Sequence, residues 1–297
     1  MSHPISFARR VDADRAFLEA ATQPLRLADG TTRRLARLGR TGRPLVVCAP
    51  TVAELSFVYA PLIRALADRY EVVLYEPRLS ESARTSLEDR VFELADVLDA
   101  LGGDPVHLVA WSDGGSAAYR LAHRHPWRVR SLTLLGLADR YRLPGPLNWV
   151  MRGMNRYPLH LITPPVVLRM LLAHFMGGPR VPRRWFYEET RRIRPFGPFL
   201  RNVVLPCMLD HRPSAGEIDL PVLLVGGDND ALVQPGQFRR LVSKLGRRAQ
   251  LVMIPGGEHL LGYADPDAVN DVVSRFLDDQ RDGPPESSLP APMGRNR

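Results

Sequence analysis

Ser112 is the residue of this sequence best placed to act as a nucleophile. It follows the apolar run of residues 107–111 and has the small residues Ala110 and Gly114 two positions away on either side. A sharp strand-to-helix turn exposes its central side chain only where its neighbours are small, because strand and helix nearly touch there. A helix starting at Asp113 would direct its N-terminal amides toward the same point. With a base, an acid to orient that base and donors for an oxyanion, such a serine could cleave an ester or an amide.

The segments around Ser112 alternate in the manner of a mostly parallel sheet flanked by helices. From residue 23 onward, short apolar runs take turns with segments of helical length and periodicity. The predicted strands are residues 25–28, 34–38, 45–49, 72–75, 107–111, 129–135, 222–225 and 250–254. The predicted helices are residues 54–70, 87–101, 114–123, 236–245 and 265–276.

The alternation breaks after the sixth predicted strand. Residues 139–216 are rich in Pro, Arg, Met and aromatic residues, with helical periodicity and no convincing strand. A helical insertion of this kind usually packs over the carboxyl edge of the sheet, where open α/β sheets bind ligands. We therefore expect an α/β core of residues 1–138 and 217–280, a helical cap over 139–216, and a disordered tail over 281–297 that is rich in Pro and Ser.

The strand, the pattern small-x-Ser-x-small and the following helix together resemble the nucleophile elbow of the α/β-hydrolase fold superfamily. Ala110 stands where that family usually has its first glycine. The resemblance covers residues 23–279 and implies a capped enzyme with a serine nucleophile. It also implies the chain order Ser, Asp, His, with the acid after a late strand and the histidine after the last one. By itself, the short pattern fits an ordinary helix N-cap equally well.

The family's order makes Asp230 the acid and His259 the base. Asp230 lies three residues after Gly227, which ends a late apolar run, and Asp228 is the fallback. His259 ends the Gly-rich turn after the last predicted strand. Asp139, just beyond the sixth predicted strand, is a minor alternative acid, because some members of the family place the acid there.

The chain departs from the family at the oxyanion loop. The third strand runs into Pro50, Thr51 and Val52 where the family has His-Gly, and Pro50 has no amide hydrogen to donate. The expected oxyanion donors are therefore the amide of Asp113 and that of Thr51 or Val52. Related folds with an altered oxyanion region run other reactions, so a lyase, cyclase or acyltransferase of natural-product biosynthesis is the first alternative. A non-enzymatic binding protein for small molecules is the second.

The expected cap favours a largely apolar acyl ester or thioester as substrate. Most of its apolar side chains would form its own core, and the remainder could line a pocket. The candidate substrate-contacting residues are Trp111, Trp149, Met154 and Phe175. The basic, aromatic segment 183–194 is interpreted as a solvated helix face with internal ion pairs. Its alternative is a landing site for a carboxylate, a phosphopantetheine arm or an acidic carrier protein.

Composition narrows the classes of partner. The formal net charge of +8 comes almost entirely from arginine, since Lys244 is the only lysine, and the basic residues are spread along the chain. We therefore expect no nucleic-acid binding. The sequence shows no apolar run long enough to span a membrane, no signal-peptide pattern and no metal-binding spacing, and its two cysteines match no disulfide pattern. We expect a cytoplasmic enzyme that acts on a small molecule and uses no metal and no cofactor.

Overall fold

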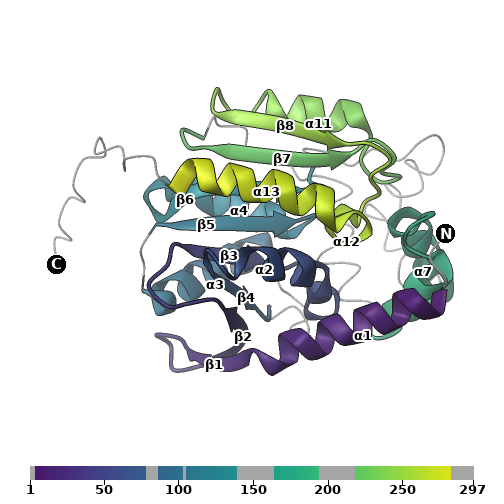
Figure 1. Cartoon of the computed structure of the whole chain (residues 1–297), viewed down its shortest axis with the longest axis horizontal. Coiled ribbons are helices and arrows are strands. Elements are labelled where there is room, and N and C mark those ends of the chain that lie inside the picture. Colours follow the sequence, from purple (N-terminus) through teal and green to yellow (C-terminus); the bar gives the residue numbers. More distant parts are fainter. Residues whose placement is uncertain (1–3, 78–85, 103–104, 139–163, 194–217, 282–297) are drawn as a thin grey trace.

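An eight-stranded sheet with the strand order β1-β2-β4-β3-β5-β6-β7-β8 runs through the protein (Figure 1). The structure is a computed structural model and describes residues 4–77, 86–102, 105–138, 164–193 and 218–281. Only β2 runs opposite to the other strands, so the predicted mostly parallel sheet is confirmed. The strands are β1 (Thr22–Arg26), β2 (Thr32–Leu38), β3 (Leu45–Ala49), β4 (Glu71–Tyr75), β5 (Val106–Trp111), β6 (Val129–Leu135), β7 (Val222–Gly227) and β8 (Ala249–Ile254).

Burial explains why the central strands could be predicted as continuous apolar runs. Every residue of β4, β5 and β7 is buried, because helices cover both faces of the sheet. The edge strands β1 and β8 are largely half-buried or exposed. On one face α2 (Ala60–Leu66) packs against α13 (Pro266–Arg281), and on the other α3 (Leu87–Leu101) packs against α4 (Gly114–Arg124) (Figure 1). The remaining core elements are η3 (Pro126–Arg128), α11 (Pro235–Val242) and α12 (Leu261–Ala264).

The sequence did not predict the first helix, α1 (Pro4–Ala20). Its buried side is a narrow stripe that includes Phe7, Val11 and Leu18, with Asp14 on the same side. The Asp14 carboxylate accepts a hydrogen bond of 2.8 Å from the hydroxyl of Tyr263 and pairs with Arg64 on α2. An acid on the buried side interrupts the apolar pattern, which is why the periodicity does not identify α1.

The prediction of one continuous helix over residues 54–70 is wrong. The segment forms a 3₁₀ helix, η1 (Ala53–Tyr59), and then α2. Pro61 lies in the first turn of α2, where a missing amide hydrogen costs nothing. Inside a continuous helix the same proline would remove a hydrogen bond and clash with the preceding turn.

The chain between β6 and β7 contains α7 (Pro165–Met176) and α8 (Arg183–Thr190), so the described part of the insertion is helical as predicted. The aromatic rings of Phe7 on α1 and Trp185 on α8 have centroids 4.7 Å apart, and Arg15 of α1 pairs with Glu189 of α8. The other parts of the predicted cap, and the predicted tail beyond Arg281, lie outside the described residues. The bounds of the cap and the disorder of the tail stay predictions. Within the described segments, no helix has the length and apolarity needed to cross a membrane.

His107 is a buried titratable group at the end of β5 opposite to Ser112. Its Nδ1 lies 2.7 Å from Oγ of Ser131 on β6, while its Nε2 has no hydrogen-bond partner among the described residues. Burial lowers the pKa of His107 to about 4, and the charge of Arg130 contributes in the same direction. The imidazole is therefore neutral in the folded protein at neutral pH.

We predict that His107 makes the fold sensitive to acid. In the unfolded chain its pKa is about 6.5, so on acidification the unfolded state binds a proton first. The contribution of His107 to stability is fully present above pH 6.5 and falls, by roughly 3 kcal/mol in total, as the pH drops to about 4. Urea unfolding at pH 7 and pH 4.5 should show that His107→Gln loses about 2 kcal/mol less stability between these pH values than the wild type. His123→Gln, at an exposed position of α4, is the control, and an equal loss in all three proteins would contradict the prediction.

Candidate active site

Ser112 occupies a strained turn between β5 and α4. It is the only non-glycine residue in the described chain with a positive φ, at +52°. Its amide donates to the carbonyl of Leu135, at the end of β6, at 2.7 Å. The left-handed conformation costs on the order of 1 kcal/mol, which the surrounding packing has to offset. The turn is also tight, because a Cβ on Gly114 would lie 2.3 Å from the carbonyl oxygen of Ala49.

The structure brings Ser112, His259 and Asp230 together in one chain of hydrogen bonds. Ser112 Oγ lies 2.9 Å from His259 Nε2, and His259 Nδ1 lies 2.8 Å from Asp230 Oδ2. The other carboxylate oxygen of Asp230 accepts the amides of Leu232 and Val233 at 2.8 and 2.9 Å, which fixes its orientation. A carboxylate only accepts, so Nδ1 carries the imidazole proton and Nε2 is left to accept the serine hydroxyl. The arrangement can therefore withdraw a proton from the serine.

The loops after β7 and β8 meet at the carboxyl edge of the sheet, which places the acid beside the histidine. A Cβ on Gly227 would lie only 2.1 Å from the carbonyl oxygen of Gly257, so the two backbones touch. The amide of Asn229 donates to the carbonyl of Gly257 at 3.0 Å. Asp228, the fallback acid, accepts the amide of Gly256 at 2.6 Å. Its carboxylate thus faces a turn amide, whereas that of Asp230 faces the imidazole. Asp139 lies outside the described residues.

Trp111 binds the loop between β8 and α12, residues 255–260, which carries His259 and which we call the histidine loop. Its indole Nε1 donates to the carbonyl of His259 at 2.9 Å, and its backbone amide donates to the hydroxyl of Tyr59 at 2.8 Å. That hydroxyl donates to the carbonyl of Ala49 at 2.7 Å. Burial raises the pKa of Tyr59 well above its usual range, so the hydroxyl stays protonated. Trp111, a predicted substrate contact, is buried and supports the loop that carries His259.

The predicted oxyanion residues lie against the elbow. Thr51 and Val52 are both buried. The Thr51 hydroxyl donates to the carbonyl of Trp111 at 3.1 Å and accepts the amide of Gly114 at 3.2 Å. The loop after β3 is therefore joined to the turn that holds Ser112.

The side chain of Asp113 forms a buried ion pair with Arg90 of α3. Both side chains are almost fully buried, and such a pair is stable only with close, well-formed contacts. From the sequence only the backbone amide of Asp113 is expected to contribute to the site, so this pair was not predicted. Nothing in the sequence marks Arg90, which is one of many arginines and occupies an ordinary position of an amphipathic helix.

The remaining predicted site residues belong to the insertion. Phe175 is buried in α7, and its ring contacts that of His174 with centroids 5.3 Å apart. Trp149 and Met154 lie outside the described residues. In the basic segment, Arg191 pairs with Glu188 at 3.0 Å, as expected for a helix face with internal ion pairs.

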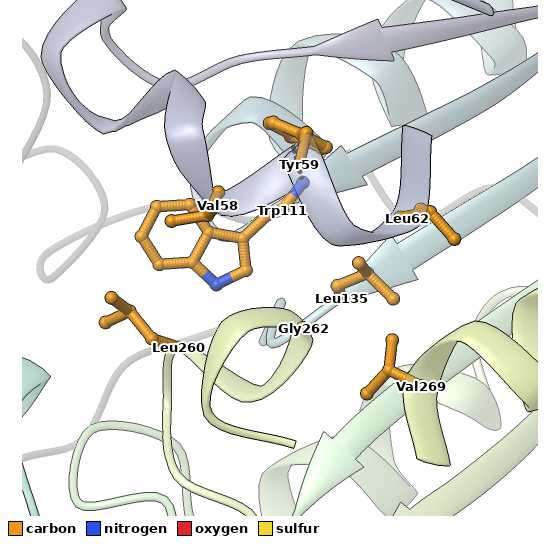
Figure 2. A pocket seen from close by; sticks show the side chains of 8 residues that line it. All are labelled: Val58, Tyr59, Leu62, Trp111, Leu135, Leu260, Gly262 and Val269. Carbon is orange, nitrogen blue, oxygen red and sulfur yellow. Dashed lines mark hydrogen bonds between the residues drawn. The ribbon is translucent and has the colours of Figure 1, made fainter. Parts of the chain in front are cut away.

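A small apolar cavity of about 10 Å³ lies behind Trp111 (Figure 2). A void of this size is at the lower limit for one water molecule, and its apolar lining offers no hydrogen-bonding groups to hold one. Figure 2 shows its wall formed by η1, α2, the ends of two strands and the segment from α12 to α13. Its lining residues are Val58, Tyr59, Leu62, Trp111, Leu135, Leu260, Gly262 and Val269.

We predict that Gly262→Ala stabilises the protein. A Cβ at this position would make ordinary contacts of 3.9 Å with Leu135 and Val269, so it would fill part of the cavity without strain. Alanine is also favoured over glycine in a helix by about 1 kcal/mol. The free energy of unfolding, measured by urea titration, should therefore rise by about 1 kcal/mol. Gly227→Ala is the opposite control and should destabilise the fold, because its Cβ would overlap the Gly257 carbonyl. A loss of stability in Gly262→Ala would contradict the prediction.

Comparison with known proteins identifies the family. The sequence model of the alpha/beta hydrolase family matches residues 45–272, so the chain belongs to that family. It is 27% identical over 261 residues to a protein of Azorhizobium caulinodans that carries the name carbamate hydrolase RutD, across 79% of this chain and 91% of that protein. It is also 27% identical over 248 residues to the poly(3-hydroxyalkanoate) depolymerase of Ectopseudomonas oleovorans, across 80% of this chain and 85% of the relative.

Solved structures agree on the fold. The enol-lactonase from Burkholderia xenovorans LB400 superposes with a TM-score of 0.69 at 20% identity, and the match covers 86% of this chain and 100% of that one. The predicted fold class, an α/β-hydrolase fold, is thereby confirmed. The family and the hydrolase names of its relatives identify the chain as a hydrolytic enzyme.

Proposed function

We propose that the protein hydrolyses carboxylic esters with Ser112 as nucleophile, His259 as base and Asp230 as the acid that orients the base. The observation that carries the proposal is the unbroken pair of hydrogen bonds, 2.9 Å from Ser112 to His259 and 2.8 Å from His259 to Asp230. The two relatives are named for a carbamate and for poly(3-hydroxyalkanoate), both of which contain a carbonyl bonded to oxygen. An ester presents the same bond to the serine.

The reaction would proceed through an acyl-serine. Ser112 Oγ attacks the carbonyl carbon while its proton passes to Nε2 of His259, and Asp230 stabilises the resulting imidazolium. The bond from the carbonyl carbon to the alcohol oxygen then breaks, and Nε2 returns the proton to the departing alcohol. A water molecule, deprotonated by the same Nε2, attacks the acyl carbon. The carboxylic acid leaves, and Ser112 takes back its proton.

The oxyanion would be bound by the amide of Asp113 and that of Thr51 or Val52. The contacts of the Thr51 hydroxyl with both sides of the elbow support this arrangement, because they hold the loop after β3 beside Ser112. The ion pair between Asp113 and Arg90 supports it as well. An unpaired carboxylate next to the nucleophile would repel the developing negative charge, and the guanidinium compensates it.

The acyl group would be largely apolar. The turn after α7 contacts Glu258, the neighbour of His259, so this part of the insertion lies beside the site. The helix itself carries mostly apolar side chains, some buried and others, such as Val166 and Met170, exposed. A wall of this composition fits an alkyl or aryl acyl chain of an ester, or of the corresponding thioester.

Replacing the nucleophile tests the proposal directly. We predict that a fluorophosphonate probe labels the wild type and that Ser112→Ala is not labelled and hydrolyses p-nitrophenyl butyrate at least about 10⁴-fold more slowly. Ser116→Ala, in the first turns of α4, is the matched control and should remain labelled. Equal labelling of Ser112→Ala and the wild type would exclude Ser112 as the nucleophile. Labelling of Ser112 without turnover of any ester would instead favour acyl transfer to an acceptor other than water.

A pair of matched substitutions distinguishes the roles of the neighbouring acids Asp228 and Asp230. We predict that Asp230→Asn lowers kcat by roughly 10³–10⁴-fold, because an amide at this position favours the wrong imidazole tautomer. Asp228→Asn should keep kcat within about threefold of the wild type, because an asparagine oxygen can still accept the Gly256 amide. Steady-state kinetics with p-nitrophenyl butyrate measure both. The reverse order of effects would make Asp228 the acid.

A further inference from the structure

Glu258, the residue immediately before His259, is a buried carboxylate that binds the insertion. Only 4% of its surface is exposed. One of its oxygens accepts the backbone amide of Arg180 at 2.8 Å, and the other accepts that of Val181 at 3.2 Å. Both amides belong to the turn between α7 and α8. The Glu258 carboxylate is therefore buried and hydrogen-bonded by two backbone amides of the insertion.

The turn between α7 and α8 is shaped around this carboxylate. A Cβ on Gly178 would lie 2.6 to 2.8 Å from the carboxyl carbon and oxygens of Glu258, so only glycine leaves room for it. The amide of Gly178 donates to the carbonyl of Val181 at 2.8 Å and closes the turn. The side chain of Arg180 adds a contact of 2.5 Å to Asp265, the residue before α13. The contacts of Glu258 and Asp265 thus tie the turn to the segment that carries His259.

We propose that Glu258 is a positioning residue that fixes the insertion beside the active site and thereby selects for acyl chains that reach it. We call the Glu258 carboxylate together with residues 178–181 the insertion latch. The proposal rests on the proposed function, because selection among acyl chains requires acyl chemistry at Ser112. His259 itself is also held by Trp111 and Asp230, both from the core. Loss of the latch should therefore move the insertion more than the imidazole.

Esters with a short and a long acyl chain distinguish a displaced insertion from a displaced imidazole. The acetyl group of p-nitrophenyl acetate reports on the triad alone, whereas an octanoyl group extends toward the insertion. We expect Glu258→Ala to lower kcat/KM for p-nitrophenyl octanoate about tenfold or more, mainly through KM, because a displaced wall no longer orients the chain. The value for the acetate should stay within about threefold of the wild type. Hydrogen exchange of the Arg180 and Val181 amides should accelerate at least about tenfold.

Gly178→Ala disrupts the insertion latch through its other partner, the turn between α7 and α8. Its methyl group would push the carboxylate away, so it should reproduce the effects of Glu258→Ala without any substitution in the histidine loop. In the double variant the methyl group meets no carboxylate, and Gly178→Ala should have little further effect. This non-additivity is the signature of a direct interaction between the two positions. Glu258→Gln, which retains one acceptor oxygen, should restore part of the octanoate activity and serves as the test should Glu258→Ala not fold.

Asp228→Ala is the matched control, because Asp228 also accepts an amide of the histidine loop but does so from Gly256. It should change the two esters alike. Equal losses on acetate and octanoate in the Glu258 variants, additive effects in the double variant, or unchanged exchange of the two amides would each overturn the latch. A wild type that hydrolyses neither ester would contradict the proposed function instead. The exchange measurement would still test the latch in that case.

Discussion

The site depends on two places where backbones approach more closely than any side chain would permit. At the first, Gly227 touches the carbonyl of Gly257, which brings the acid loop to the histidine loop. At the second, Gly114 touches the carbonyl of Ala49, which brings the turn that holds Ser112 to the loop after β3. Hydrogen bonds of 2.8 and 2.9 Å along the triad leave little tolerance for displacement. A methyl group on Gly227 would force the loop after β7 away from the loop after β8, and one on Gly114 would force the turn of Ser112 away from the end of β3.

Two buried carboxylates next to the triad are compensated by different parts of the fold. Asp113 follows Ser112 and pairs with Arg90 of α3, whereas Glu258 precedes His259 and accepts two amides of the insertion. Burial of an uncompensated carboxylate is very costly, so each residue requires its partner to be in place. The nucleophile turn is thereby bound to a core helix, and the histidine loop is bound to the insertion.

The sequence predicted those features that depend on local pattern. Central strands such as β5 are covered on both faces, so they read as apolar runs. The turn after β5 resembled a nucleophile elbow, and the chain order that this resemblance implies pointed from Ser112 to Asp230 and His259. Features that depend on distant partners were not predictable. Asp14 interrupts the apolar stripe of α1, so the sequence pattern does not show the helix. This buried acid is tolerated because it pairs with Arg64 and Tyr263, which are distant in the sequence. The partners of Asp113 and Glu258 are likewise distant in sequence, and no pattern joins them.

The described part of the insertion is held at two places. The turn between α7 and α8 binds Glu258, and α8 itself packs on α1 through the aromatic pair of Phe7 and Trp185 and the ion pair of Arg15 and Glu189. The helix α1 lies outside residues 45–272, the stretch that matches the family. Ser112, Asp230 and His259 all follow strands of the sheet within that stretch, whereas α8 is held in part by a helix outside it. If Ser112 acts as we propose, the substrate range would change through α1 and Glu258 without any change in the chemistry.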